Sequence, residues 1–169
     1  MKRFHFILAV LILTLSSAFA AHAGIPPKSG SILCQGLVPA DFANVGIANA
    51  SLPKTNVSEG GASAYCVYSG QSSATGGIEL DVFYPAGANA IESKATLETA
   101  IGESSSIQKP IAVAGADEAS WSPHAVSGGP PFATIAVRRA NLVFVIGVPA
   151  GKDAQTQLLK LADIVLKRF

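Results

Sequence analysis

The sequence predicts an α+β domain of two layers, in which helices pack on one face of an antiparallel sheet of about five strands. The first observation is the order of its segments, α-β-β-α-β-β-β-α, in which short β-prone runs are separated by single helical stretches. The second is the run 132–148, FATIAVRRANLVFVIGV, where two such runs are joined by a turn too short for a parallel crossover.

This hairpin is expected to lie in the middle of the sheet. Apolar residues alternate along its first strand and fill both faces of its second (Ile135, Val137, Leu142, Val143, Phe144, Val145 and Ile146). A strand that is apolar on both faces is typical of a sheet interior. In the connection, Asn141 is expected to adopt the left-handed conformation that a tight turn requires.

The first half of the domain predicts one helix and two strands. Over 39–46, Pro39 suits the first helical position and Gly46 suits the residue after the last. Residues 47–62 contain Pro53 and two glycines and predict a surface loop. Strands follow over 64–68 and 78–84, and the second alternates apolar residues with Glu79 and Asp81.

The second half predicts the remaining elements. The Ala, Glu, Lys and Leu content of 88–101 favours a helix. Residues 111–113 and 115–121 have irregular β character, and the Gly- and Pro-rich stretch 122–131, SPHAVSGGPP, predicts a loop. After Asp153, apolar residues recur at helical spacing to Phe169, with basic residues in the last turn.

The N-terminus has the three parts of a secretory signal peptide, which we assign to 1–23. Lys2 and Arg3 precede an apolar run over 6–15, and Ala21-His22-Ala23 is a cleavage pattern, with Ala18-Phe19-Ala20 as a second site. An uncleaved anchor is the alternative, but the run is shorter than the ~20 residues that span a bilayer. We expect a flexible leader at 24–31, a single domain at 32–169, and a periplasmic or secreted protein.

Composition narrows the partners of this exported chain. Without residues 1–23 the chain has ten Lys and Arg and eleven Asp and Glu, a net charge of −1. It therefore has no net positive charge that would favour binding to nucleic acid or to an anionic membrane surface. No later segment is apolar enough for stable membrane insertion after cleavage. Cys34 and Cys66 are the only cysteines, and in an oxidising compartment they predict one disulfide that stabilises the fold by roughly 3 to 4 kcal/mol.

The candidate ligand-binding residues are Trp121, His124, Arg138 and Arg139, beside the 122–131 loop. A single Trp next to such a loop could clamp a ligand, and arginines could bind its anionic group. In the competing interpretation Trp121 covers the core, His124 is solvated, and the arginines are charges at a strand edge that discourage aggregation.

Catalytic chemistry has less support in the sequence. With His124 as the only histidine of the exported part, we expect no metal site and no cofactor. A thiol enzyme would need Cys34 or Cys66 free, and a serine enzyme would use Ser127 near His124, although Ser127 lacks the G-x-S-x-G pattern. We therefore assign no catalytic residue.

Four short motifs span most of the exported chain: Cys34-Gln-Gly-Leu37, Cys66-Val-Tyr68, Gly115-Ala-Asp-Glu-Ala119 followed by Trp121, and Val137-Arg-Arg139 entering a turn. In these features the chain resembles small bacterial exported or lipoprotein domains of unknown function, which include domains similar to the extracellular sensor of a mycobacterial serine/threonine kinase. The lipid-anchoring cysteine of that group is missing here. The resemblance implies a fold and a compartment, and it transfers no active-site residue.

The sequence thus favours a non-enzymatic binding or interaction domain of the bacterial cell envelope, acting on an envelope protein or a small ligand. Two alternatives remain, namely an enzyme that uses a cysteine or serine near His124 and a structural envelope protein.

Overall fold

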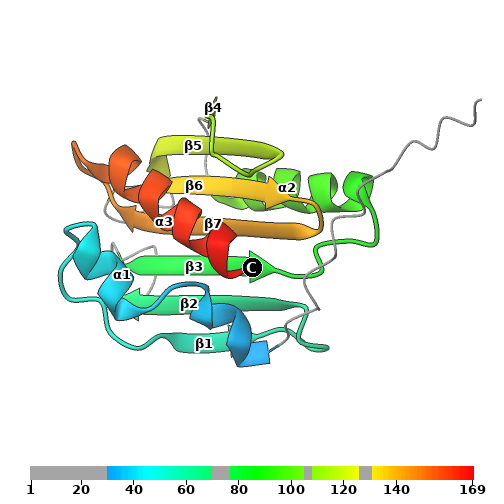
Figure 1. The fold of residues 1–169 in the computed structure, drawn as a ribbon, viewed down its shortest axis with the longest axis horizontal. Helices are drawn as coiled ribbons and strands as arrows, with labels where there is room; N and C mark the ends of the chain where they lie inside the picture. Colours follow the sequence, from blue (N-terminus) through cyan, green and yellow to red (C-terminus); the bar gives the residue numbers. More distant parts are fainter. Residues whose placement is uncertain (1–29, 70–76, 105–107, 126–130) are drawn as a thin grey trace, which may run out of the picture.

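The computed structural model describes residues 30–69, 77–104, 108–125 and 131–169. Within these residues the α+β class is confirmed, because seven strands form one antiparallel sheet in the order β1-β2-β3-β7-β6-β5-β4 (Figure 1). The strands are β1 (Lys54–Val57), β2 (Ser63–Ser69), β3 (Ile78–Phe83), β4 (Lys109–Pro110), β5 (Glu118–Ala125), β6 (Phe132–Arg139) and β7 (Leu142–Pro149). The helices are the 3-10 helix η1 (Gly30–Gly36) and the α-helices α1 (Pro39–Asn44), α2 (Ala90–Ser104) and α3 (Ala154–Arg168).

The sheet is wider than the five strands that we expected, because both of its edges were missed. The first edge, β1, lies within the 47–62 segment that we assigned to a loop. The other edge is β4, a strand of only two residues. Two further boundaries differ: β5 continues to Ala125, into the expected 122–131 loop, and η1 begins at Gly30, within the expected leader.

Helices cover both faces of the sheet, which corrects the expectation that they pack on one face. Leu97 and Ala100 of α2 form a small core with Ala136, Val143 and Val145. The alternate residues of the same two strands join a larger core with α3, η1 and α1. Figure 1 shows the same arrangement, with α3 in front of the sheet and α2 behind it. The molecule therefore has three layers, α2, the sheet, and a layer formed by α3 with the N-terminal helices.

The predicted hairpin is confirmed as β6 and β7, which pair from Phe132↔Pro149 to Arg139↔Leu142. Strand β7 also pairs with β3, and β6 pairs with β5, so the hairpin lies in the middle of the sheet as expected. In the two-residue turn, however, Ala140 has the positive φ of 52° that we had assigned to Asn141. The backbone amide of Ala140 donates to the Asp117 carboxylate at 2.7 Å, which holds the turn in this conformation.

The first helix begins and ends where its sequence predicts. Pro39 opens α1, and Gly46, just beyond its end, has a φ of 81°. Asp41 accepts a hydrogen bond from the Val38 amide at 2.7 Å, so its carboxylate caps the start of the helix. The same carboxylate lies against Arg168 of α3 in two contacts of 2.5 and 2.8 Å, which ties the two ends of the described chain together.

The predicted disulfide joins Cys34 of η1 to Cys66 of β2, with 5.6 Å between the Cα atoms. Beside it, the buried Tyr68 hydroxyl contacts the carbonyl oxygens of Cys34 at 2.7 Å and Leu37 at 3.1 Å. Burial raises the pKa of the Tyr68 phenol well above its ordinary value of 10.0, and the negative charge of Asp41 raises it further. The phenol therefore remains a hydrogen-bond donor over the whole neutral range.

The end of α3 closes over this N-terminal layer. Phe169 packs on Gly36, where an added Cβ atom would lie 2.7 Å from its ring, so the contact requires a residue without a side chain. Along the described part of the chain, no helix combines the length and apolar character needed to cross a membrane.

We expect Asp41→Ala to lower the free energy of unfolding by roughly 2 to 3 kcal/mol, because it removes a helix cap and leaves Arg168 without its bidentate partner. Urea unfolding measures this loss. The control is Asp163→Ala, which breaks an exposed pair with Lys167 on α3 and should cost about 0.5 kcal/mol or less. Equal losses in the two variants would contradict the structural role of Asp41.

Tyr68 should make the fold sensitive to alkali. Because its pKa is raised on folding, its contribution is complete below the ordinary pKa of 10.0 and is lost as the pH rises above that value. We expect Tyr68→Phe to cost about 1 to 2 kcal/mol at pH 7, and the difference from the wild type to shrink above pH ~10. Urea unfolding at stepped pH measures it. A difference that stayed constant to pH ~11 would argue against this role.

Candidate functional site

The sheet separates the residues that we expected to form one ligand-binding site. Trp121 lies opposite Ile135 in the β5–β6 ladder, and both pack against the core on the α3 side. Arg138 lies opposite Val143, whose side chain belongs to the core on the α2 side. Its neighbour Arg139 faces α3 and donates to the Leu166 carbonyl at 2.6 Å, in the last turn of that helix. Trp121 and Arg139 therefore lie on one face and Arg138 on the other.

The described part of the structure does not bring the remaining candidate residues together in a site. His124 belongs to β5, and Ser127 lies outside the described residues. The sulfur atoms of Cys34 and Cys66 are bonded to each other, so neither acts as a thiolate in this oxidised form. Within the described ranges, no three His, Cys, Asp or Glu residues are grouped closely enough to hold a metal ion.

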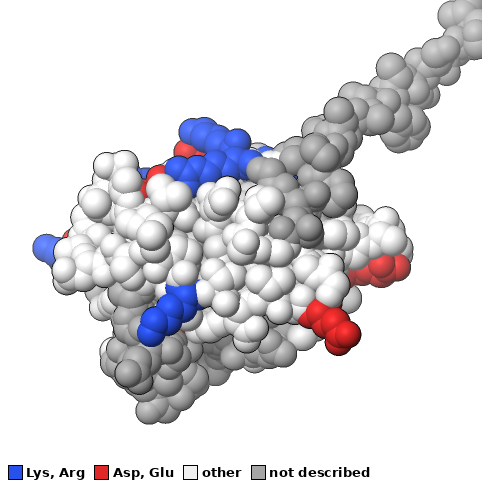
Figure 2. Space-filling view, turned by 90° about the horizontal axis from the view of Figure 1, so that it is seen from below, with Lys and Arg blue, Asp and Glu red and all other residues white. Residues whose placement is uncertain are grey.

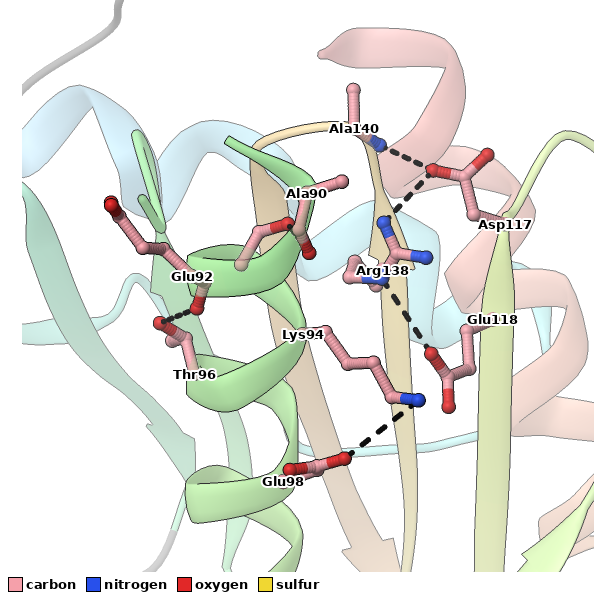
Figure 3. A network of polar contacts seen from close by, with 10 residues as sticks. Ala90, Glu92, Lys94, Thr96, Glu98, Asp117, Glu118, Arg138 and Ala140 are labelled. Atoms are coloured by element: carbon pink, nitrogen blue, oxygen red, sulfur yellow. Dashed lines mark hydrogen bonds and ion pairs between the residues drawn. The ribbon is translucent and has the colours of Figure 1, made fainter. Parts of the chain in front are cut away.

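Arg138 is the centre of a polar network on the α2 side of the sheet (Figure 3). Its guanidinium lies 3.3 Å from an Asp117 oxygen and 3.6 Å from a Glu118 oxygen. Asp117 also accepts the Ala140 amide, and its own amide donates to the Arg138 carbonyl at 2.9 Å. The side chain of Arg138 is only 13% exposed, so these contacts hold a largely buried cation beside the turn.

Helix α2 begins beside this network, and side-chain hydrogen bonds cap its N-terminus. The Asn89 side chain accepts hydrogen bonds from the amides of Ile91 at 2.9 Å and Glu92 at 3.0 Å. The Glu92 carboxylate reaches back to the Ala88 amide at 2.7 Å. These bonds fix the first turn of α2 and so set the direction in which Ile91 and Lys94 project.

Between α2 and β6 an open groove of about 480 Å³ is lined by Ala90, Ile91, Lys94, Ala95, Glu98 and Arg138, and we call it the α2 groove. Its volume falls within the range of small-ligand sites. The side chain of Lys94 extends from α2 toward Arg138 and Glu118, and its ammonium lies 3.9 Å from Glu98 (Figure 3). Ile91 is 83% exposed at the same site.

The α2 groove combines an apolar wall with two cationic side chains and the carboxylate of Glu98. Two alanines, Ile91 and the alkyl stem of Lys94 form the wall, and Lys94 and Arg138 supply N–H groups. Because Lys94 is more than half exposed and its pair with Glu98 is long, its ammonium is available to an incoming acceptor group at little cost. This arrangement suits a ligand with an apolar body and an anionic or carbonyl end.

No protein-family model matches the chain, and no curated protein proves similar to it in sequence. The resemblance to exported domains and to a kinase sensor therefore remains a prediction from the motifs.

Sequence reasoning selected Arg138 but missed the α2 residues that complete the groove. Ile91 could have been found, because it lies outside the buried stripe formed by Ser93, Leu97 and Ala100. The separation of Arg138 from Arg139 was also readable, since adjacent residues of a strand point to opposite faces. Asp117 lies in one of the quoted motifs, but its role was not predictable, because that role depends on the β6–β7 turn, which is distant in sequence.

We expect Asp117 to hold the β6–β7 turn mainly by accepting the Ala140 amide. Asp117→Ala should then lower the free energy of unfolding by about 1 to 2 kcal/mol, and Asp117→Asn, which keeps an acceptor oxygen, by about half as much or less. Thermal unfolding monitored by circular dichroism measures both. Equal losses for the two substitutions would show that charge, and not the bond to the turn, is what matters.

Proposed function

We propose that this chain is an exported, non-enzymatic binding domain of the bacterial cell envelope that takes an amphipathic ligand in the α2 groove. The observation that carries the proposal is the position of Ile91. A large apolar side chain projects into solvent at a groove that is otherwise lined by two alanines, two cationic side chains and the carboxylate of Glu98. Covering Ile91 with an apolar group would remove its surface from water and favour binding by about 1 to 2 kcal/mol.

The Cys34–Cys66 disulfide supports the export part of this proposal. Disulfides persist in oxidising compartments such as the periplasm or the medium, and this one is buried between η1 and β2. The signal-peptide features of residues 1–23 also support export.

The ligand part can be tested with 8-anilinonaphthalene-1-sulfonate, whose aromatic rings and sulfonate match the wall and the cations of the α2 groove. We expect saturable binding, seen as enhanced dye fluorescence, and about tenfold weaker binding to Ile91→Ser. The matched control is Leu52→Ser, since Leu52 is 81% exposed but lies outside the groove. Binding that does not saturate, or that both substitutions weaken equally, would refute the groove as the site.

Export can be tested by expressing the full chain in a bacterium and analysing the protein recovered from the periplasm and the medium by intact mass. We expect a chain that starts after Ala23 or Ala20 and contains no free thiol. A cytoplasmic chain that retains residues 1–20 would contradict export without bearing on the groove.

A further inference from the structure

Strand β1 is an open edge of the sheet. Among the described strands it pairs with β2 alone, and Lys54, Thr55 and Asn56 are exposed. Figure 2 looks onto this edge and shows a broad surface on which charged side chains are few. Exposed apolar side chains flank the strand, with Leu52 81% exposed just before it and Ile32 of η1 49% exposed. Lys54 is the one charged residue of this strand, and the backbone groups of an open edge are ones on which a further strand can pair.

The hydrogen bond beyond the end of β1 identifies which backbone groups face outward. The Ser58 amide donates to the Ser63 carbonyl at 3.0 Å, so the backbone of Ser58 points toward β2. In an antiparallel ladder the residues alternate in this respect. The backbone N–H and C=O groups of Lys54 and Asn56 therefore point toward β2, like those of Ser58. The N–H and C=O groups of Thr55 and Val57 point away from the sheet.

We propose that two copies of this chain associate through their β1 strands, antiparallel and about a twofold axis at Asn56, so that the sheet continues from one copy into the other. Twofold symmetry with matching faces allows only registers in which a residue lies opposite itself. Centring on Asn56 places Thr55 opposite the partner copy's Val57, and both have outward N–H and C=O groups. Centring on Thr55 would instead place Val57 opposite Pro53, which has no N–H to donate.

The side chains around β1 are complementary to themselves in this register. The two Asn56 side chains meet at the axis, where each amide can donate to the other. Lys54 lies opposite Ser58 of the second copy, on the same face of the sheet as Asn56. Leu52 lies opposite Gly60, where no atom is within 4 Å of the position that a Cβ atom would occupy, so there is room for the leucine side chain.

A pairing over so few residues buries little surface, so the association is expected to be weak, with a dissociation constant in the micromolar to millimolar range. Sedimentation velocity of the disulfide-bonded protein across this concentration range should show a monomer–dimer equilibrium. A protein that stays monomeric at millimolar concentration overturns the proposal, whatever the dye experiment on the α2 groove shows.

Two cysteine variants test the register. Asn56→Cys should form a covalent dimer under mild oxidation. The two copies of residue 56 would form a non-hydrogen-bonded antiparallel pair, in which the Cα atoms are about 4.5 Å apart, close enough for a disulfide. Lys54→Cys on the same face is the control, since its two copies would be about 13 Å apart. Peptide mapping must show Cys34 and Cys66 still joined. Equal cross-linking of the two variants overturns the register.

Discussion

Both faces of the β6–β7 hairpin are buried, and this requirement shapes the whole fold. Ile135, Phe144 and Ile146 need cover on one side, and Ala136 and Val143 need it on the other. A sheet with apolar residues on both faces is stable in water only if each face is packed against another layer. Helix α3 supplies one layer and α2 the other, so the three layers follow from the composition of two strands.

The two outer layers are held in different ways. On the α3 side, the disulfide, the Tyr68 hydroxyl and the Asp41–Arg168 pair connect η1, α1, β2 and α3 into one hydrogen-bonded unit. On the α2 side the core is smaller, and the first turn of α2 is fixed by its own caps. The groove and the exposed Ile91 lie on the α2 face, which has fewer bonds between elements. The candidate site is therefore away from the elements that stabilise the fold.

Much of the architecture was predictable because it rests on local chemistry. The hairpin has a long alternating pattern, α1 has Pro39 and Gly46 at its ends, and two cysteines leave only one possible disulfide. Strand β1 was missed because Lys54, Thr55 and Asn56 are polar and exposed, so an edge strand of this kind shows no apolar alternation. Strand β4 is too short to give any pattern.

The second helical layer and the site were harder to predict for a physical reason. The apolar character of Val143 and Val145 indicated a central strand, but which helix would cover that side depends on the crossover between β3 and β4. The α2 groove joins residues more than forty positions apart, Lys94 and Arg138, and no spacing rule relates them. The residue with positive φ in the turn also differs from the expected one. Asp117, just before β5, stabilises Ala140 in a conformation that Asn141 would adopt more readily.

The two borders of the sheet are unlike each other. At one end the chain presents an open strand, and at the other it finishes in β4, where Pro110 lacks the donor that a growing ladder would need. When two molecules pair through their β1 strands, each uses the only open edge that its described strands offer. Any assembly built this way would terminate after one step, which protects a β-rich protein against unlimited fibre growth.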